Sequence, residues 1–190
     1  SARKSVLCGS PMLAIEQKPY ILRRNGGCFM LYFLLAAAVV AADFFTKRWA
    51  YTTLSKVETI PLIKNVFHLT YVENRGAAFG MLKDQRWIFI TLSVIILALL
   101  AAVIIKKKNK PWYLSLGLSF VGAGAVGNLI DRIWIGFVVD LFDFRLINFP
   151  VFNVADIFVC LGAAILAIYF IIDDEKKDKG KEYESNNRQN

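Results

Sequence analysis

The stretch from Gly127 to Asp156 decides the predicted fold. It reads Gly127-Asn128-Leu129-Ile130-Asp131-Arg132, then Val138-Val139-Asp140, then Phe152-Asn153-Val154-Ala155-Asp156. These polar motifs stand between two strongly apolar runs. An ionisable side chain costs roughly 2.5–3.5 kcal/mol at the centre of a bilayer, so those that a membrane protein keeps are usually functional. We predict a site where two membrane helices meet the outer membrane surface.

Composition supports a membrane protein. The chain has 190 residues, of which 56% are hydrophobic, and its mean hydropathy is +0.47. Soluble domains are about 45–50% apolar. The net charge of +8 does not indicate a nucleic-acid partner. Basic residues beside apolar runs report topology and contact with anionic lipid, and no nucleic-acid recognition module is present.

Four apolar runs predict four transmembrane helices, since a span needs about 20 residues. The third run contains several glycines, which let membrane helices approach closely. The predicted spans are 28–45, 87–105, 112–130 and 151–172.

The lysine block at 106–110 directly follows the second span and predicts that this loop is cytoplasmic. Both termini are then cytoplasmic, and residues 46–86 and 131–150 lie outside. Residues 48–86 are rich in β-branched and aromatic side chains with loose alternation, which predicts short strands. The expected fold is therefore a mainly α membrane protein with a small external β-sheet between the first and second helices.

The two ends of the chain differ from this domain. Residues 1–29 are polar, basic and without periodicity, and we predict a disordered N-terminal extension. Residues 30–172 form the four-helix domain, including the external β segment 48–86. Residues 173–190 are charged and polar, which predicts a disordered cytoplasmic tail.

Helical spacing groups the polar residues further. Asn128, Asp131 and Arg132 share one face at the outer end of the third span, where Arg132 could pair with Asp131. Asn153 and Asp156 share a face in the first turns of the fourth span, where the helix dipole favours an ionised carboxylate.

Asp43 and Lys47 are also four residues apart, a spacing typical of a surface ion pair at a helix end. Asp140 lies outside any helical pattern, so we expect an extended segment or loop to carry it.

Two aspartates in a dry site share one proton, so one can activate water while the other polarises a carbonyl group. Such a pair hydrolyses a peptide bond without a metal. Neither His68 nor the cysteines Cys8, Cys28 and Cys160 have metal-ligand spacing, so no metal or cofactor is predicted. Spacing leaves open which two of four candidates form the pair, namely Asp131, Asp140, Asp143 and Asp156. A buried ion-pair network and an ion or proton transport pathway are alternative hypotheses for the same residues.

Five motifs together resemble the lipoprotein signal peptidases, the type II signal peptidases of bacteria. They occur in the order and spacing of that family across residues 30–172. The motifs are Asp43-Phe44-Phe45-Thr46-Lys47, Asn74-Arg75-Gly76-Ala77-Ala78-Phe79-Gly80, Gly127-Asn128-Leu129-Ile130-Asp131-Arg132, Val138-Val139-Asp140 and Phe152-Asn153-Val154-Ala155-Asp156.

The resemblance implies a membrane-embedded aspartyl endopeptidase of the bacterial inner membrane. Its substrate would be a diacylglyceryl-modified prolipoprotein, cleaved just before the lipidated cysteine. We expect a monomer that has membrane lipid as its other partner. The implied catalytic pair is Asp140 and Asp156. The implied supporting residues are Asp43, Lys47, Asn74, Gly76, Asn128, Asp131, Arg132 and Asn153.

Overall fold

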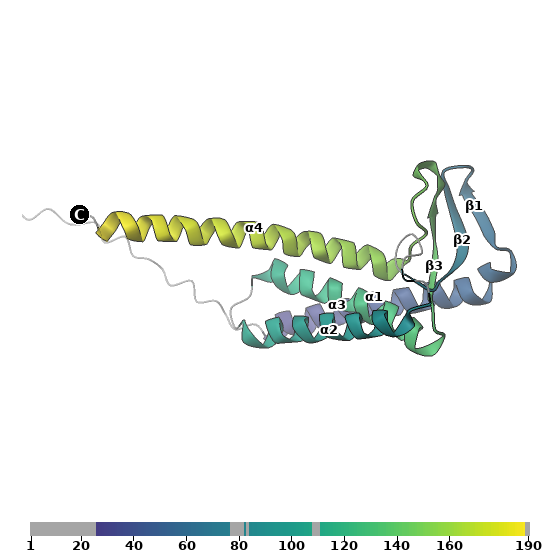
Figure 1. Cartoon of the computed structure of the whole chain (residues 1–190), viewed down its shortest axis with the longest axis horizontal. Coiled ribbons are helices and arrows are strands. Elements are labelled where there is room, and N and C mark those ends of the chain that lie inside the picture. The colour runs from purple at the N-terminus through teal and green to yellow at the C-terminus, as the bar shows by residue number, and fades with distance from the viewer. Residues whose placement is uncertain (1–25, 77–81, 83, 108–110, 189–190) are drawn as a thin grey trace, which may run out of the picture.

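The computed structural model describes residues 26–76, 82, 84–107 and 111–188. Four long helices lie roughly along one axis, and a small sheet crosses one end of them (Figure 1). The helices are α1 (Gly26–Thr52), α2 (Arg86–Lys106), α3 (Trp112–Trp134) and α4 (Val154–Arg188). The strands are β1 (Thr59–Ile63), β2 (Phe67–Asn74) and β3 (Val138–Phe144). Two short 3₁₀ helices are η1 (Leu54–Lys56) and η3 (Arg145–Ile147).

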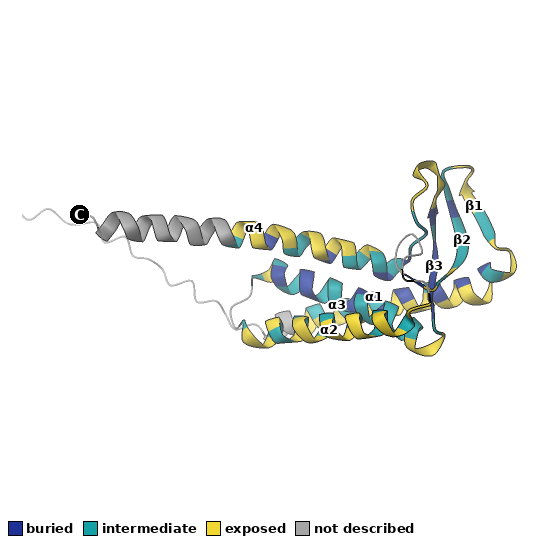
Figure 2. Ribbon diagram, viewed as in Figure 1, coloured by how far each residue is buried: buried dark blue, intermediate teal, exposed yellow. Residues whose placement is uncertain are grey.

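Four of the described helices are long and apolar enough to cross a membrane, which agrees with the predicted number of spans. Their candidate spans are Met30–Lys56, Arg86–Lys106, Trp112–Trp134 and Val154–Asp173. Most of their outward surface is exposed in Figure 2, and no residue of α2 is buried. Apolar side chains on such a surface are stable when lipid surrounds them.

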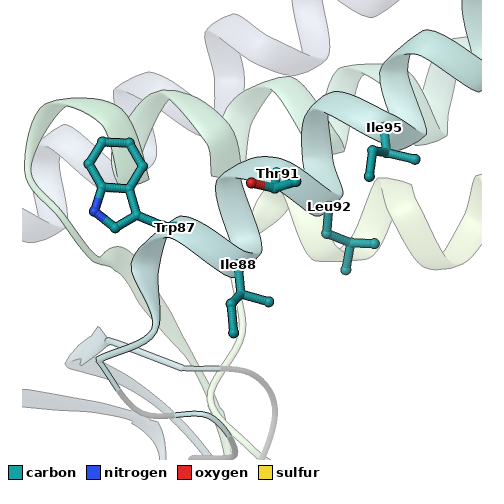
Figure 3. Close-up of a pocket in the computed structure, with 5 residues that line it drawn as sticks. All are labelled: Trp87, Ile88, Thr91, Leu92 and Ile95. Carbon is teal, nitrogen blue, oxygen red and sulfur yellow. The ribbon is translucent and has the colours of Figure 1, made fainter.

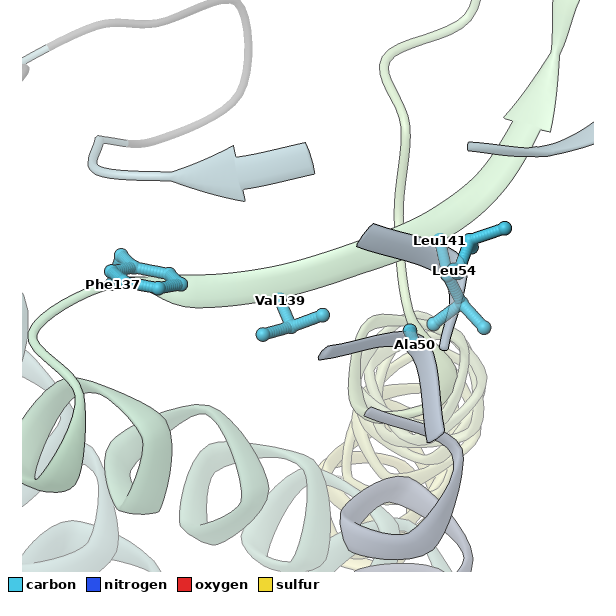
Figure 4. Packing of buried hydrophobic residues seen from close by; sticks show 5 residues of the cluster. All are labelled: Ala50, Leu54, Phe137, Val139 and Leu141. Carbon is cyan, nitrogen blue, oxygen red and sulfur yellow. The ribbon is translucent and has the colours of Figure 1, made fainter. Parts of the chain in front are cut away.

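The first span was predicted too short. It was predicted to end at residue 45, but α1 continues to Thr52, so residues 48–52 belong to a helix and not to the β segment. The helix continues because its last turns pack against the sheet. Ala50 and Leu54 are fully buried against Val139 and Leu141 of β3, with Phe137 in the same cluster (Figure 4). The helix begins at Gly26, inside the predicted extension 1–29, of which residues 1–25 lie outside the described part of the chain.

The sheet has three strands in the order β1-β2-β3, and both pairings are antiparallel. The prediction of a small β-sheet with strands between the first and second helices is confirmed, but the sheet has one further strand from elsewhere in the chain. Only β1 and β2 come from that segment, while β3 comes from the connection between α3 and α4. The expectation that an extended segment carries Asp140 is confirmed, because Asp140 lies within β3 opposite Val72.

Helix α3 packs against each of the other three helices. Its contact with α4 is close because both helices present glycines: a Cβ atom built on Gly117, Gly124 or Gly162 would lie within 3 Å of the neighbouring helix. Small residues at such positions allow close packing in membranes. This contact fixes the start of α4, which carries Asp156, against the middle of α3.

The fourth helix differs from its prediction at both ends. It begins at Val154 and not near residue 151, because Phe152 forms a bridge with Phe142 of β3. At the other end it continues to Arg188, where we predicted a disordered tail. The residues from Asp173 onward are rich in lysine and glutamate, which favour helix, so a charged composition alone did not indicate disorder.

A shallow apolar hollow lies along one side of α2, between Trp87 and Ile95 (Figure 3). Its lining consists of α2 side chains alone, and none of the predicted site residues is among them. The hollow is therefore part of the lipid-facing surface of this helix and not of the predicted site.

Candidate active site

Polar side chains from five elements meet at the end of the bundle where the sheet lies. Each of them makes a hydrogen bond or an ion pair with another polar group of this region, and Gly76 joins through its backbone. The polar cluster, as we call it, consists of Asp43, Lys47, Asn74, Asn128, Asp131, Arg132, Asp140, Asn153 and Asp156. The structure thus brings together every residue that the family resemblance implied for the site, but not Asp143, the other candidate acid.

Lys47 is the buried cation of the polar cluster. Its side chain is 3% exposed, and its Nζ atom lies 2.8 Å from Asp43 Oδ2 and 3.2 Å from Asp131 Oδ2. It also donates to Asn128 Oδ1 at 2.8 Å. Asp43 and Lys47 therefore share a helix face as predicted, but they are buried within α1 and do not form a surface pair. Removing one partner of a buried ion pair typically costs 3–5 kcal/mol.

Two aspartates hold backbone amides of other elements. Asp43 Oδ1 accepts a hydrogen bond from the Ala155 N–H at 2.8 Å, and Asp131 Oδ2 accepts one from the Val139 N–H at 3.1 Å. The Ala155 N–H is one of the first-turn donors that a helix leaves unpaired. Asp43 thereby fixes the start of α4, and Asp131 fixes the start of β3. The suggested pairing of Asp131 with Arg132 was wrong, because Lys47 takes that place.

Asn153 connects the two aspartates that the resemblance implicates in catalysis. It caps α4: its Oδ1 accepts from the Asp156 N–H at 3.0 Å, and its own N–H donates to Asp156 Oδ2 at 3.2 Å. This reciprocal arrangement is a capping box. Its Nδ2 donates to Asp140 Oδ1 at 2.6 Å. Asn153 was expected in the first turns of the helix, but it lies just before the first helical residue.

The orientation of each asparagine amide follows from its donors. Asn128 Oδ1 accepts from Lys47, so its Nδ2 faces Asp156 Oδ1, at 2.7 Å. Asn74 Oδ1 accepts from the Gly76 N–H at 3.0 Å, so its Nδ2 faces Asp140 Oδ2, at 2.9 Å. Because an amide group has one acceptor end and one donor end, each carboxyl group receives N–H donors.

Among the carboxylic acids outside the membrane spans, Asp140 has the most strongly shifted pKa. It is 1% exposed. Burial raises the pKa of Asp140 to about 7, with a further increase from the negative charge of Asp156. Hydrogen bonds from Asn74 and Asn153 and the charge of Lys47 oppose this increase only in part. Asp140 therefore keeps its proton up to near-neutral pH. Strong perturbation of this kind is typical of functional sites.

Asp143 lies outside the polar cluster although it is only three residues from Asp140. It accepts from Thr70 Oγ1 at 2.7 Å and from Arg145 Nε at 2.8 Å. Burial acts to raise its pKa, but the hydrogen bonds from Arg145 and Thr70 outweigh burial, so the pKa of Asp143 lies below its usual value. Among the four candidate acids, only Asp140 and Asp156 are joined through one residue, Asn153.

Arg132 is placed by contacts that the sequence did not predict. Its guanidinium lies 4.9 Å from the centre of the Phe89 ring and donates to the Asn128 carbonyl at 3.4 Å and the Gly76 carbonyl at 3.5 Å. Phe89 stands in an unbroken apolar span, so no sequence signal separates it from its neighbours. Residues 77–80 of the glycine-containing motif lie outside the described part of the chain.

Comparisons with known proteins agree with this geometry. The model of the signal peptidase (SPase) II family matches residues 35–172. A lipoprotein signal peptidase of Clostridioides difficile is 48% identical over 151 residues, covering 77% of this chain and 99% of the relative. One of Brevibacillus brevis is 46% identical over 147 residues, with coverages of 77% and 99%. A solved bacterial membrane enzyme is 32% identical with a TM-score of 0.73, covering 78% of this chain and 92% of that one. This chain, a multi-pass membrane protein with aspartates at one end of its bundle, therefore belongs to the signal peptidase II family of aspartic-type peptidases.

Proposed function

We propose that this protein removes the signal peptide from diacylglyceryl-modified prolipoproteins by cleaving before the lipidated cysteine, with Asp140 and Asp156 as the catalytic pair. The observation that carries the proposal is the bridge made by Asn153, which bonds both carboxyl groups. Asp140 is buried and Asp156 is half-buried, and two neighbouring acids in such different environments can divide the roles of proton donor and proton acceptor.

The environments of the two acids assign these roles. Asp140 is the acid, because its pKa of about 7 leaves roughly half of the molecules protonated there at neutral pH, where an ordinary aspartate is fully ionised. Asp156 is the base. It stands in the first turn of α4, where the helix dipole favours negative charge, and it accepts from Asn128 and from the Asn153 N–H.

Peptide hydrolysis then proceeds without a covalent intermediate. Asp156 takes a proton from water while the water oxygen bonds to the scissile carbonyl carbon, and Asp140 gives its proton to the carbonyl oxygen. The tetrahedral intermediate breaks its C–N bond as Asp156 returns a proton to the leaving nitrogen. Asp140 recovers its proton as the new carboxyl group forms, so both acids end in their starting states.

The remaining residues of the polar cluster position this pair. Asp43 and Asp131 hold backbone N–H groups of α4 and β3, and Lys47 pairs with both of them. Asn74 and Asn128 orient the carboxyl groups of Asp140 and Asp156. Arg132 holds the Gly76 carbonyl beside Asn74. Gly76 is thereby the one backbone position of the 74–80 motif that contributes contacts to the site in the described residues.

We place the protein in the bacterial inner membrane as a monomer with both termini in the cytoplasm and the site near the outer face. Support comes from Lys106 and Lys107 at the end of α2 that is opposite the sheet (Figure 1). A lipid-modified substrate would then approach sideways from the bilayer to a site at the membrane surface.

The transport hypothesis is less well supported. A relay of protons or ions needs ionisable groups at several depths of the membrane. In the described spans, the ionisable groups of the site lie instead at the end that meets the sheet, namely Asp43, Lys47, Asp131 and Asp156. Between Arg86 and Lys106, α2 carries no charged residue. The distribution of charges therefore favours hydrolysis at one surface.

The decisive experiment measures cleavage of a diacylglyceryl-modified prolipoprotein by purified protein and by the variants Asp140→Asn, Asp156→Asn and Asp143→Asn. General acid or base groups contribute roughly 10²–10⁴-fold to rates, so we expect losses of at least this size in the first two variants. Asp143→Asn is the matched control on the same strand, and it should keep most of the activity. Thermal unfolding in detergent verifies folding of each variant.

Two results would overturn the proposal. If folded Asp140→Asn or Asp156→Asn cleaved at the wild-type rate, the catalytic pair would be assigned wrongly. If folded wild-type protein left several lipid-modified prolipoproteins intact, the substrate class itself would be wrong.

A further inference from the structure

The end of the sheet away from the helices carries large apolar side chains on its surface. Leu146 is 69% exposed and Ile147 is 68% exposed, although neither lies in a membrane span. Contiguous exposed apolar side chains mark an interaction surface. We define the sheet tip as Leu62 and Ile63 of β1, Leu146 and Ile147 of η3, and Phe149.

The backbone of the sheet tip is held in place by hydrogen bonds. The Arg145 N–H donates to the Val66 carbonyl at 3.0 Å, which ties η3 to the turn between β1 and β2. Arg145 Nε donates to Asp143 Oδ2 at 2.8 Å, and the Phe149 N–H donates to the Phe144 carbonyl at 3.2 Å. Asn148 has a φ angle of 48°, a left-handed conformation that asparagine tolerates in tight turns. These bonds present the apolar side chains outward without burying them.

Aromatic rings form the base of this surface. The rings of Phe144 and Phe149 both lie against Phe152, with centroids 6.1 Å and 5.7 Å away. The Phe67 ring lies 4.7 Å from Phe144. The exposed side chains of the tip therefore continue an aromatic layer that reaches back toward the start of α4.

The position of the sheet tip relative to α4 determines whether the tip faces lipid or protein. Figure 1 shows the sheet crossing the end of the bundle, with its tip projecting past α4 and the β3–α4 connection running back on the side toward that helix. Because α4 crosses the membrane, a tip that projects sideways beyond it lies over lipid and not over protein. On α4 itself, Ile157 and Leu161 are also exposed apolar side chains, as expected of a helix surrounded by lipid.

We propose that the sheet tip inserts its apolar side chains into the headgroup region of the bilayer next to α4. Lys64, exposed in the turn between Ile63 and Val66, has a long apolar stem and a charged end, which suits the boundary between acyl chains and lipid phosphates. The sheet would then be tethered on one side by α1 and on the other by lipid. This tether holds β3, and with it Asp140, at a fixed height above the membrane.

Site-specific quenching tests this proposal without any measurement of activity. Ile147→Cys and, as a replicate, Leu146→Cys are made in a chain whose three native cysteines are serine. Each is labelled with a nitrobenzoxadiazole dye and reconstituted into vesicles. The control is Glu58→Cys, because Glu58 is exposed just before β1, at the end of the strand away from the tip and outside the candidate membrane spans. We expect lipids carrying a nitroxide on the upper acyl chain to quench the tip labels several-fold more than the control label.

Each other outcome would overturn the proposal. If aqueous iodide quenched labels at 146, 147 and 58 equally and nitroxide lipids quenched none of them, the tip would lie in water. If the tip labels escaped both quenchers, and became accessible to iodide only on dilution of protein in the vesicles, a second copy of the chain would cover the tip. Thermal unfolding of each labelled protein verifies that the fold is kept.

Discussion

Gly124 is the position where the closeness of α3 and α4 can be tested most directly. A Cβ atom built there would lie 2.4 Å from the Ala155 carbonyl oxygen and 2.6 Å from Val159 Cγ2. Optimal separations between non-bonded carbon atoms are roughly 3.5–4.0 Å. The substitution Gly124→Ala therefore requires the first turn of α4 to move by about 1 Å. The carbonyl involved is backbone, so no change of rotamer can relieve the contact.

The matched control is Gly122→Ala, two residues earlier on the same helix. A Cβ atom on Gly122 would lie 3.8 Å from Leu100 Cδ1, an ordinary contact. Both substitutions bring the same gain in helix propensity, up to about 1 kcal/mol, so their difference isolates the packing. Overpacking costs typically 1–3 kcal/mol. Because Asp156 follows Ala155, a shift of about 1 Å at this turn should also lower cleavage roughly 10²-fold.

The assay combines thermal unfolding in a mild detergent with cleavage of a lipid-modified prolipoprotein. One kcal/mol shifts Tm by roughly 2–4 °C in a chain of this size, so Gly124→Ala should melt several degrees below Gly122→Ala. The lost activity should appear mainly in kcat, since the displaced group is Asp156. Equal Tm values and equal activities for the two variants would refute the close contact between α3 and α4 at the start of α4.

Two further predictions concern buried charge. Since the pKa of Asp140 is about 7 in the fold, and about 3.9 in the unfolded chain, the folded protein binds more protons between these values and loses stability as pH rises through them. Asp140→Asn should therefore gain up to roughly 4 kcal/mol relative to wild type between pH 4 and pH 8, seen as diverging Tm curves, whereas parallel curves would contradict the raised pKa. Lys47→Met leaves Asp43 and Asp131 without their cation and should cost about 3–5 kcal/mol in unfolding free energy, partly recovered by adding Asp131→Asn. A Lys47→Met protein with the same unfolding free energy as wild type would show that the ion pairs of Lys47 with Asp43 and Asp131 do not stabilise the fold.

Much of the fold followed from local patterns in the sequence. Apolar runs of spanning length predicted the helices, because the cost of exposing backbone in lipid leaves helix as the usual solution. The aspartates around residues 131–156 stood out because such groups are rare beside apolar spans, and pairing of two of them suggested aspartyl hydrolysis. The full set of site residues from Asp43 to Asp156 came from the resemblance of five motifs to a known family.

The sequence predicted less well where the helices end and which residues contact each other. Asp43 and Lys47 looked like the end of the first helix. Helix α1 continues past them because Ala50 packs against β3, together with Leu54 of η1, which follows directly. The third strand was not placed in the sheet, since its partner β2 lies more than sixty residues earlier in the chain. Spacing alone also suggested Arg132 as the partner of Asp131, whereas Lys47 reaches it from another helix.

What the sequence by itself determined is therefore the number of spans and the extended nature of the segment around Asp140. These depend on side-chain type and on the local period of the chain, whereas the set of site residues followed from the family motifs. Only the tertiary structure separated Asp143 from the site and joined Asp140 to Asp156 through Asn153. The reason is that these contacts depend on how α3, α4 and the sheet pack, and close packing at Gly124 and Gly127 places the acids relative to one another.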